Sequence, residues 1–136
     1  MVKIFVGLKG SGKTKTLIEK ANSTVEASNG TVVCIEKGTK LIHEITYRAR
    51  LINTDEYRVT DADSLFGFVA GIIASDHDAK DIFIDSALKI CNDDPDSFEY
   101  FVKKIAKLAE EQEVNLVMTA SVALENVPES VKAYVA

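Results

Sequence analysis

A glycine-rich stretch near the amino end follows the pattern G-x-x-x-x-G-K-[ST], with Gly7, Gly12, Lys13 and Thr14 at its fixed positions. Glycines let the backbone curl so that several N–H groups point into one concavity, which binds anions. A lysine supplies a mobile positive charge for β- and γ-phosphates, and a threonine hydroxyl can coordinate Mg²⁺. The pattern predicts a phosphate-binding loop; the alternative is a flexible turn with a solvated lysine.

The context of the loop supports the first interpretation. The apolar run 2–6 has the composition of a buried strand and leads directly into the glycines, and a helical pattern begins at Thr16. The first N–H groups of a helix are unpaired and lie at the positive end of its dipole. We therefore expect residues 7–14, including Gly10 and Ser11, to surround a phosphate group.

A second chemical feature is an acid at the end of an apolar run. Residues 81–85 read Asp-Ile-Phe-Ile-Asp, which places Asp85 at the carboxyl end of a predicted strand. With both motifs the chain resembles the P-loop NTPase superfamily, in which 7–14 is similar to the Walker A motif and 81–85 to the Walker B motif. The resemblance implies that the chain binds ATP and that Thr14 and Asp85 hold Mg²⁺. Asp85 could instead be a strand-ending acid that caps a turn.

The position after Asp85 departs from the superfamily's usual pattern. A glutamate commonly follows the Walker B aspartate in the large ATPase branch, whereas this chain has Ser86, which cannot accept a proton as a carboxylate does. RecA-like ATPases, which the chain also resembles, can place the glutamate on the neighbouring strand. The run 31–36 ends in Glu36, so the resemblance implies Lys13 and Glu36 as catalytic residues. The alternative for Glu36 is an exposed acid at the start of a loop.

The resemblance to RecA-like folds extends to the strand over 114–121. In those folds the strand that follows the Walker B strand inserts beside the P-loop strand and ends in a polar residue that senses the γ-phosphate. Thr119 and Ser121 occupy that region, and Thr119 is assigned to the nucleotide site on this basis. Type II thymidine kinases share such a core more distantly. Their glutamate after the Walker B aspartate and their cysteine-rich zinc element are absent here, which argues against that activity.

The remaining pattern predicts an α/β fold, a three-layer α/β/α sandwich in a single domain over residues 1–136. Apolar runs without polar alternation are typical of a parallel sheet that is covered on both faces, and here they alternate with helical patterns. We expect strands over 2–6, 31–36, 81–87 and 114–121, a weaker strand over 57–59, and helices over 16–27, 41–52, 61–76 and 93–112. Asp63 and Asp94 are the expected N-caps of the last two helices, and the tail fits either a short helix or a strand.

Composition limits the partners. A net charge of −5 argues against a general affinity for nucleic acid or anionic membranes. The longest apolar run, 65–74, is too short to cross a bilayer and no secretory signal is visible, so we expect a cytoplasmic protein with no membrane partner. Cys34 and Cys91 have no metal-binding spacing, and Cys34 is expected to be a small core residue. The RecA-like resemblance implies a possible homo-oligomer, with Arg48, Arg50 or Arg58 as the arginines that could stabilise transition-state charge.

Three functions follow from these observations. The first is a Mg²⁺-dependent ATPase of low activity, with a nucleoside triphosphate as substrate. The second is a regulatory module that binds ATP without hydrolysing it, which the serine at position 86 and the short chain favour. The third and weakest is a nucleoside or small-molecule kinase, because no arginine-rich lid segment is evident.

Overall fold

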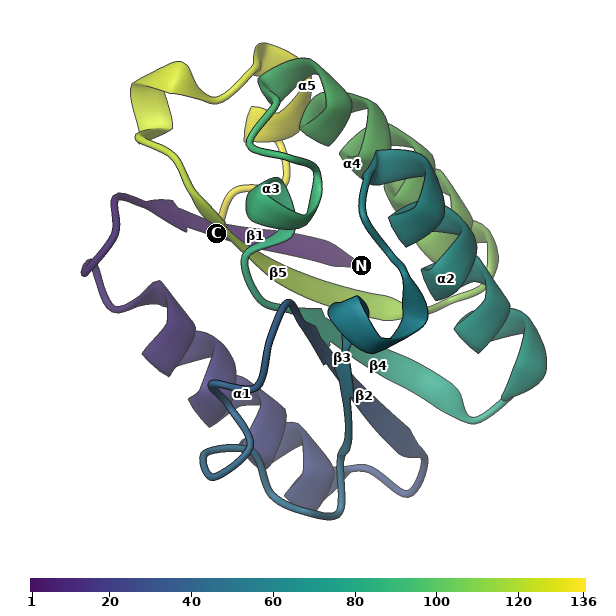
Figure 1. The fold of residues 1–136 in the computed structure, drawn as a ribbon. Helices are drawn as coiled ribbons and strands as arrows, with labels where there is room; N and C mark the ends of the chain where they lie inside the picture. Colours follow the sequence, from purple (N-terminus) through teal and green to yellow (C-terminus); the bar gives the residue numbers. More distant parts are fainter.

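The computed structural model describes residues 1–136 and contains one five-stranded sheet in which all strands are parallel. The order across the sheet is β1-β5-β4-β2-β3 (Figure 1). The strands are β1 (Val2–Gly7), β2 (Thr31–Glu36), β3 (Arg50–Asn53), β4 (Ala79–Ile84) and β5 (Asn115–Ser121). The expected α/β class with a parallel sheet is confirmed.

Helices lie on both faces of the sheet (Figure 1). One face carries α1 (Lys13–Ala27), and the other carries α2 (Ala62–Ser75) and α4 (Pro95–Glu111), which pack against each other. Short helices complete the fold: α3 (Ala87–Ile90), α5 (Glu129–Lys132), and the 3₁₀ turns η1 (Thr54–Tyr57) and η2 (Leu124–Asn126). The arrangement is compatible with a three-layer sandwich.

The order of the strands places the two expected chemical motifs close together. The strand β5 lies beside β1 and β2 lies beside β4, as the resemblance to RecA-like folds implied, and β5 also pairs with β4. In this register Ile84 of β4 is paired with Ile35 of β2 and with Met118 of β5. Because all strands are parallel, the residues that follow β1, β2 and β4 meet at one edge of the sheet.

Each face of the sheet has its own hydrophobic core. The larger cluster joins the sheet to α2 and α4 and includes the fully buried Phe101 and Ile105. The smaller cluster lies under α1 and includes Leu17, Cys34 and Phe83. Burial of Cys34 is confirmed and raises the pKa of its thiol to about 12, so this side chain stays neutral at physiological pH.

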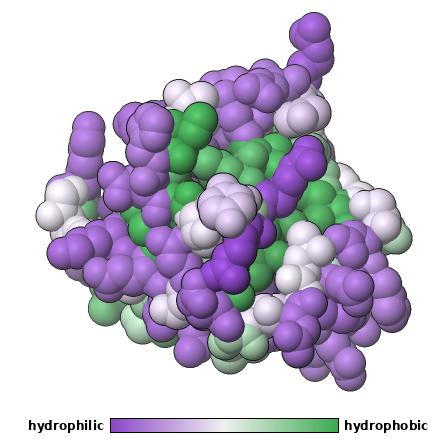
Figure 2. All heavy atoms as spheres, turned by 90° about the horizontal axis from the view of Figure 1, so that it is seen from below, coloured by the Kyte–Doolittle hydropathy of each residue, from purple (hydrophilic) through white to green (hydrophobic).

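The face with α1 is less completely covered than the other. Seen from below Figure 1, apolar residues are visible between hydrophilic side chains, some of which cross the middle of the view (Figure 2). A groove of about 530 Å³ runs between α1 and the sheet, with Phe83 and Val117 among its lining residues and Lys3 and Lys20 on its rim. No helix of the structure has the length and apolar character that a bilayer crossing requires.

The predicted helix over 41–52 is wrong. Residues 40–44 and 47–48 form turns, and Ile52 belongs to β3. The apolar spacing reflects burial of Leu41, Ile45 and Ala49 against the smaller core. Side-chain hydrogen bonds hold the segment in this form: Asn22 of α1 donates from Nδ2 to the Glu44 carbonyl (2.9 Å) and accepts from the Thr46 amide (2.9 Å). These tertiary contacts override the local periodicity.

Three further element assignments need correction or refinement. The strand expected over 57–59 does not form, because Tyr57 ends η1 and Arg58 adopts a left-handed backbone with φ 59°. The strand expected over 81–87 ends at Ile84, and Ala87 begins α3. The tail contains the short helix α5, and Val135 then forms a single parallel bridge to Ile4.

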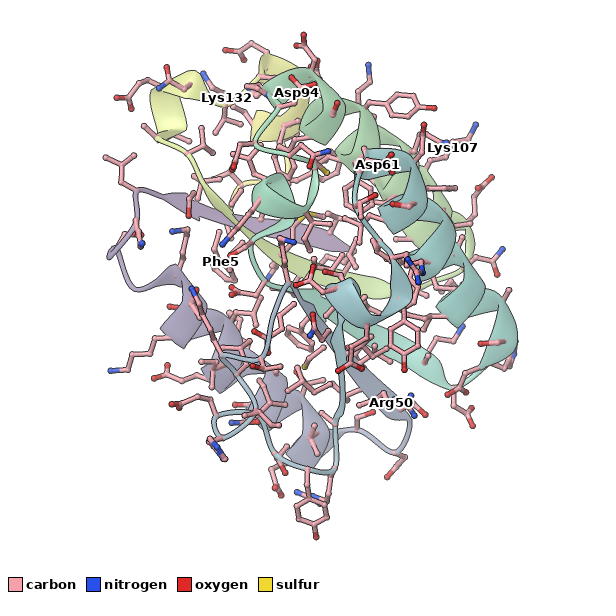
Figure 3. The ribbon with its side chains drawn as sticks, viewed as in Figure 1. Phe5, Arg50, Asp61, Asp94, Lys107 and Lys132 are labelled. Atoms are coloured by element: carbon pink, nitrogen blue, oxygen red, sulfur yellow. The ribbon has the colours of Figure 1, made fainter.

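The N-cap of α4 is Asp94, as expected, whereas the N-cap of α2 is Asp61 and not Asp63 (Figure 3). The Asp61 carboxylate accepts from the Ser64 amide (2.8 Å), and the Ser64 hydroxyl oxygen accepts from the Asp61 amide (3.1 Å). This is a reciprocal capping box, and it was overlooked because Asp63 stands closer to the first apolar residue of the helix.

We expect Asp61→Ala to lower the melting temperature at pH 7, because hydrogen bonds from the Ser64 amide and hydroxyl lower the pKa of Asp61 below its ordinary value of 3.8. A lowered pKa in the folded state means that the carboxylate contributes stability above pH 3.8, and that this contribution disappears as pH falls through the folded-state pKa. Thermal melts of both proteins at pH 7 and at lower pH measure the effect. Asp63→Ala is the matched control and should change the melting temperature less; an equal change would contradict the assignment of the cap.

Candidate functional site

The glycine loop is closed by a contact that only glycine permits. A Cβ on Gly7 would lie 2.5 Å from the Ser11 hydroxyl oxygen, which is closer than side-chain atoms approach. Gly12 is the N-cap of α1 and has φ 88°, a left-handed backbone that other residues rarely adopt. The Ser11 amide donates to the Leu8 carbonyl (3.1 Å) and tightens the turn. These features give the loop a tight turn that leads into α1.

The amino end of α1 is open. No side chain caps it, and the amides of Gly12, Lys13, Thr14 and Lys15 donate to no protein acceptor. The first turn contains no acidic residue. A helix of 15 residues thus presents unpaired donors and the positive end of its dipole beside the Lys13 side chain. The Lys13 ammonium donates to the Leu8 carbonyl (3.3 Å), the only hydrogen bond it makes.

Asp85 is the centre of a small hydrogen-bond network. Its Oδ1 accepts from the hydroxyl of Thr14 (3.1 Å) and from the hydroxyl of Thr119 (2.7 Å). Asp85 is buried and directly follows β4. The structure thus brings together two residues that the sequence assigned to metal binding, although they are 71 positions apart.

Thr119 has a more internal position than a phosphate sensor would need. It is fully buried, it donates to Asp85, and its hydroxyl oxygen accepts from the Ser86 amide (2.8 Å). These two bonds orient the Asp85 carboxylate and the start of α3. The residue of β5 that does line the cleft described below is Ser121, which the sequence had placed in the same region.

Ser86 directly follows Asp85, at the position where the resemblance described above led us to look for a glutamate. It is the N-cap of α3 and has a left-handed backbone with φ 59°. Its hydroxyl makes only a long contact, 3.5 Å, with the Asp85 Oδ2. Oδ2 is therefore the less engaged oxygen of the carboxylate.

Glu36 ends β2 and is buried, with 3% of its surface exposed. One carboxylate oxygen accepts from the Lys40 amide (3.1 Å) and the other from the Leu41 amide (3.0 Å). Burial raises the pKa of Glu36, and the two amide hydrogen bonds oppose that shift without cancelling it. The alternative of an exposed acid is wrong, because Glu36 both anchors the following loop and lines the cleft.

A cleft of about 260 Å³ joins these groups at the carboxyl edge of the sheet. Its lining residues come from the segments that follow β1, β2, β4 and β5, and they include Thr14, Glu36 and Asp85. Five of them are lysines: Lys9, Lys13, Lys37, Lys40 and Lys89. The protein carries a net charge of −5, yet this cleft has five ammonium groups against two carboxylates. This excess of positive charge would attract an anionic ligand.

Four of these lysines were not found from the sequence. Lys9, Lys37, Lys40 and Lys89 share no spacing, and only the parallel sheet brings the loops that carry them together. The signal that could have found them is the lysine that lies within a few positions after each of the predicted strands 2–6, 31–36 and 81–87. The arginines considered earlier do not line the cleft. Arg48 pairs with Glu26 of α1, and Arg50 lies on the edge strand β3 (Figure 3).

The groups at this site that could hold a metal ion are the Thr14 hydroxyl and the Asp85 carboxylate. These oxygen donors suit Mg²⁺ better than a tightly held transition metal. No group of three or more histidine, cysteine, aspartate or glutamate side chains is placed to bind a metal ion. Magnesium is commonly held by one or two carboxylates together with substrate phosphates and water. The Thr14 hydroxyl and the Asp85 carboxylate, in contact at 3.1 Å, provide such a partial set.

Comparison with known proteins gives no independent assignment. Neither a scan against protein-family models nor a search of curated proteins found a match to this chain.

Proposed function

We propose that the chain is a P-loop protein that binds a nucleoside triphosphate, ATP in the first instance, together with Mg²⁺, and that it hydrolyses ATP slowly. The observation that carries the proposal is the open amino end of α1 in a cleft lined by five lysines, with Thr14 and Asp85 in contact beside it. Unpaired helix amides and lysine ammonium groups bind phosphate oxygens. The strand order is compatible with a RecA-like core.

The residues have distinct roles in this proposal. Gly7, Gly10, Ser11 and Gly12 shape the loop whose amides surround the phosphates, and Lys13 neutralises their charge. Thr14 and Asp85 would hold Mg²⁺, which supplies charge neutralisation for the β- and γ-phosphates. The buried Thr119 keeps the Asp85 carboxylate in position through a 2.7 Å hydrogen bond.

Glu36 is the group that can accept a proton from an attacking water. In the reaction the water oxygen forms a bond to the γ-phosphorus, the bond from the γ-phosphorus to the β–γ bridging oxygen breaks, ADP leaves, and the water proton passes to Glu36. A raised pKa suits a general base near neutral pH. Both Glu36 oxygens already accept backbone hydrogen bonds, which supports a low rate.

A second candidate function is ATP binding without turnover, for use as a regulatory module. Ser86 in place of a glutamate and the engagement of Glu36 by the Lys40 and Leu41 amides favour it. The two functions share the binding site and differ only in whether water is activated.

Calorimetric titration with Mg-ATP, Mg-ADP and AMP tests the proposal, with phosphate release measured on the same samples. We expect saturable binding whose affinity falls from Mg-ATP to Mg-ADP to AMP. We also expect the wild type to release phosphate slowly. In Glu36→Gln phosphate release should fall to the background while ATP binding persists. Equal phosphate release by the wild type and Glu36→Gln would favour the binding module. No saturable binding of Mg-ATP would overturn the proposal.

A further inference from the structure

The cleft has two walls that carry positive charge. The loop after β1 provides Lys9 and Lys13 beside the amino end of α1. The segments after β2 and β4 provide Lys37, Lys40 and Lys89. The first wall already contains Lys13, the lysine that the glycine motif requires. The motif does not explain the three lysines of the second wall.

Two lysines of the second wall are free to bind a ligand. Lys37 is paired with Asp55 at 2.7 Å. Neither Lys40 nor Lys89 forms an ion pair or a side-chain hydrogen bond within the protein, and both are exposed. Unpaired ammonium groups on a cleft wall attract an anionic ligand.

The backbone segments that carry these two lysines are fixed by the acids of the site. Glu36 accepts from the Lys40 amide (3.1 Å). On the other segment, the Ser86 amide at the start of α3 donates to Thr119, which donates to Asp85. Lys89 lies one turn further along α3. Groups held in place before a ligand arrives lose less conformational entropy on binding.

The charge balance indicates the size of the anion. Five lysines line the cleft with Glu36 and Asp85, and one of them, Lys37, is paired with Asp55, so positive charge remains in excess. A fully ionised triphosphate tail with one Mg²⁺ carries about −2, whereas a diphosphate tail with Mg²⁺ carries about −1. The excess positive charge therefore attracts the triphosphate complex more strongly than the diphosphate complex.

We propose that Lys40 and Lys89 bind the terminal phosphate across the cleft from the glycine loop, and that they select a triphosphate over a diphosphate. They act within the same chain and supply the positive charge that no arginine provides at this site. The inference rests on the proposed function, because it concerns the phosphate chain of the same ligand.

The double variant Lys40→Ala/Lys89→Ala tests this inference, with inorganic tripolyphosphate and pyrophosphate as probes in Mg²⁺, followed by ATP and ADP. We expect the ratio of tripolyphosphate to pyrophosphate affinity to fall by roughly three- to tenfold for each lysine removed. The single variants assign the effect to each residue, and Lys89→Arg should retain most of the selectivity. Circular dichroism and thermal melts should match the wild type, since both side chains are exposed.

The matched control is Lys103→Ala/Lys107→Ala, which removes the same charge from the exposed surface of α4; neither residue lines the cleft. Lys107 is labelled in Figure 3. This control should leave the affinity ratio unchanged. If the wild type binds triphosphate but the cleft variant keeps the wild-type ratio, or the control lowers it equally, this inference fails and the proposed function stands. If the wild type binds none of the four probes, the proposed function fails and this inference with it.

Discussion

Lys13→Ala is expected to weaken Mg-ATP binding by about 10- to 150-fold, because hydrogen bonds to charged groups contribute about 1.5–3 kcal/mol and each 1.4 kcal/mol changes an affinity tenfold. Lys13 lines the cleft, and its ammonium makes one long hydrogen bond, to the Leu8 carbonyl at 3.3 Å. A phosphate oxygen is a better acceptor than this carbonyl because it is charged. Calorimetric titration at fixed ionic strength measures the loss.

Lys15→Ala is the matched control for this prediction. Lys15 lies two residues further along α1, carries the same charge and does not line the cleft. Its removal should weaken Mg-ATP binding less than threefold, the range of a screened surface charge of roughly 0.2–0.6 kcal/mol. If Lys13→Ala and Lys15→Ala weaken binding equally, the loss reflects the protein's overall charge and not a contact made by Lys13. The loop is then not a specific phosphate site.

The parts of the fold that were predictable from sequence are those fixed by short-range patterns. The strands β1, β2 and β5 are continuous apolar runs, and such runs identify buried parallel strands. The glycine loop was also visible, because the close approach of Gly7 to Ser11 and the left-handed backbone of Gly12 both demand glycine within a short stretch. The strand neighbours of β4 followed from the resemblance to RecA-like folds and are confirmed.

The segment 41–52 could not be predicted in this way. Leu41, Ile45 and Ala49 recur at helical spacing because they are buried against α1, but a recurring apolar spacing does not reveal which hydrogen bonds the backbone makes. Here the Glu36 carboxylate accepts from the Leu41 amide, five residues further along, and the Asn22 side chain accepts from the Thr46 amide, 24 residues further along. Apolar periodicity shows neither of these side-chain contacts.

The site was predictable only where a motif has fixed spacing. Thr14 and Asp85 were assigned from the two motifs, and the structure brings them into contact. The buried position of Thr119 and the additional lysines of the cleft depend on register and loop conformation, which the sequence does not display. Sequence therefore predicted a phosphate loop, and the structure was needed to show that five lysines line the cleft beside it.

Asp85→Asn is expected to change ATP affinity in opposite directions with and without Mg²⁺. A buried carboxylate near a polyphosphate repels it, so removing the charge should leave ATP binding in EDTA equal or stronger. In Mg²⁺ the same change should weaken ATP binding by about 10- to 100-fold, the usual cost of altering a group that orients or holds a metal ligand. Titrations with ATP in EDTA and in excess Mg²⁺ measure the two affinities.

The matched control is Asp81→Asn, which removes the same charge from β4 near its amino end, remote from the cleft. It should leave the Mg²⁺ dependence of ATP binding unchanged. Asparagine at position 85 keeps one carbonyl oxygen to accept from Thr14 or Thr119, so the network survives in part and the protein should fold. If Asp85→Asn weakens binding equally in EDTA and in Mg²⁺, Asp85 is a structural acid that fixes β5 and α3, and the metal must be held elsewhere.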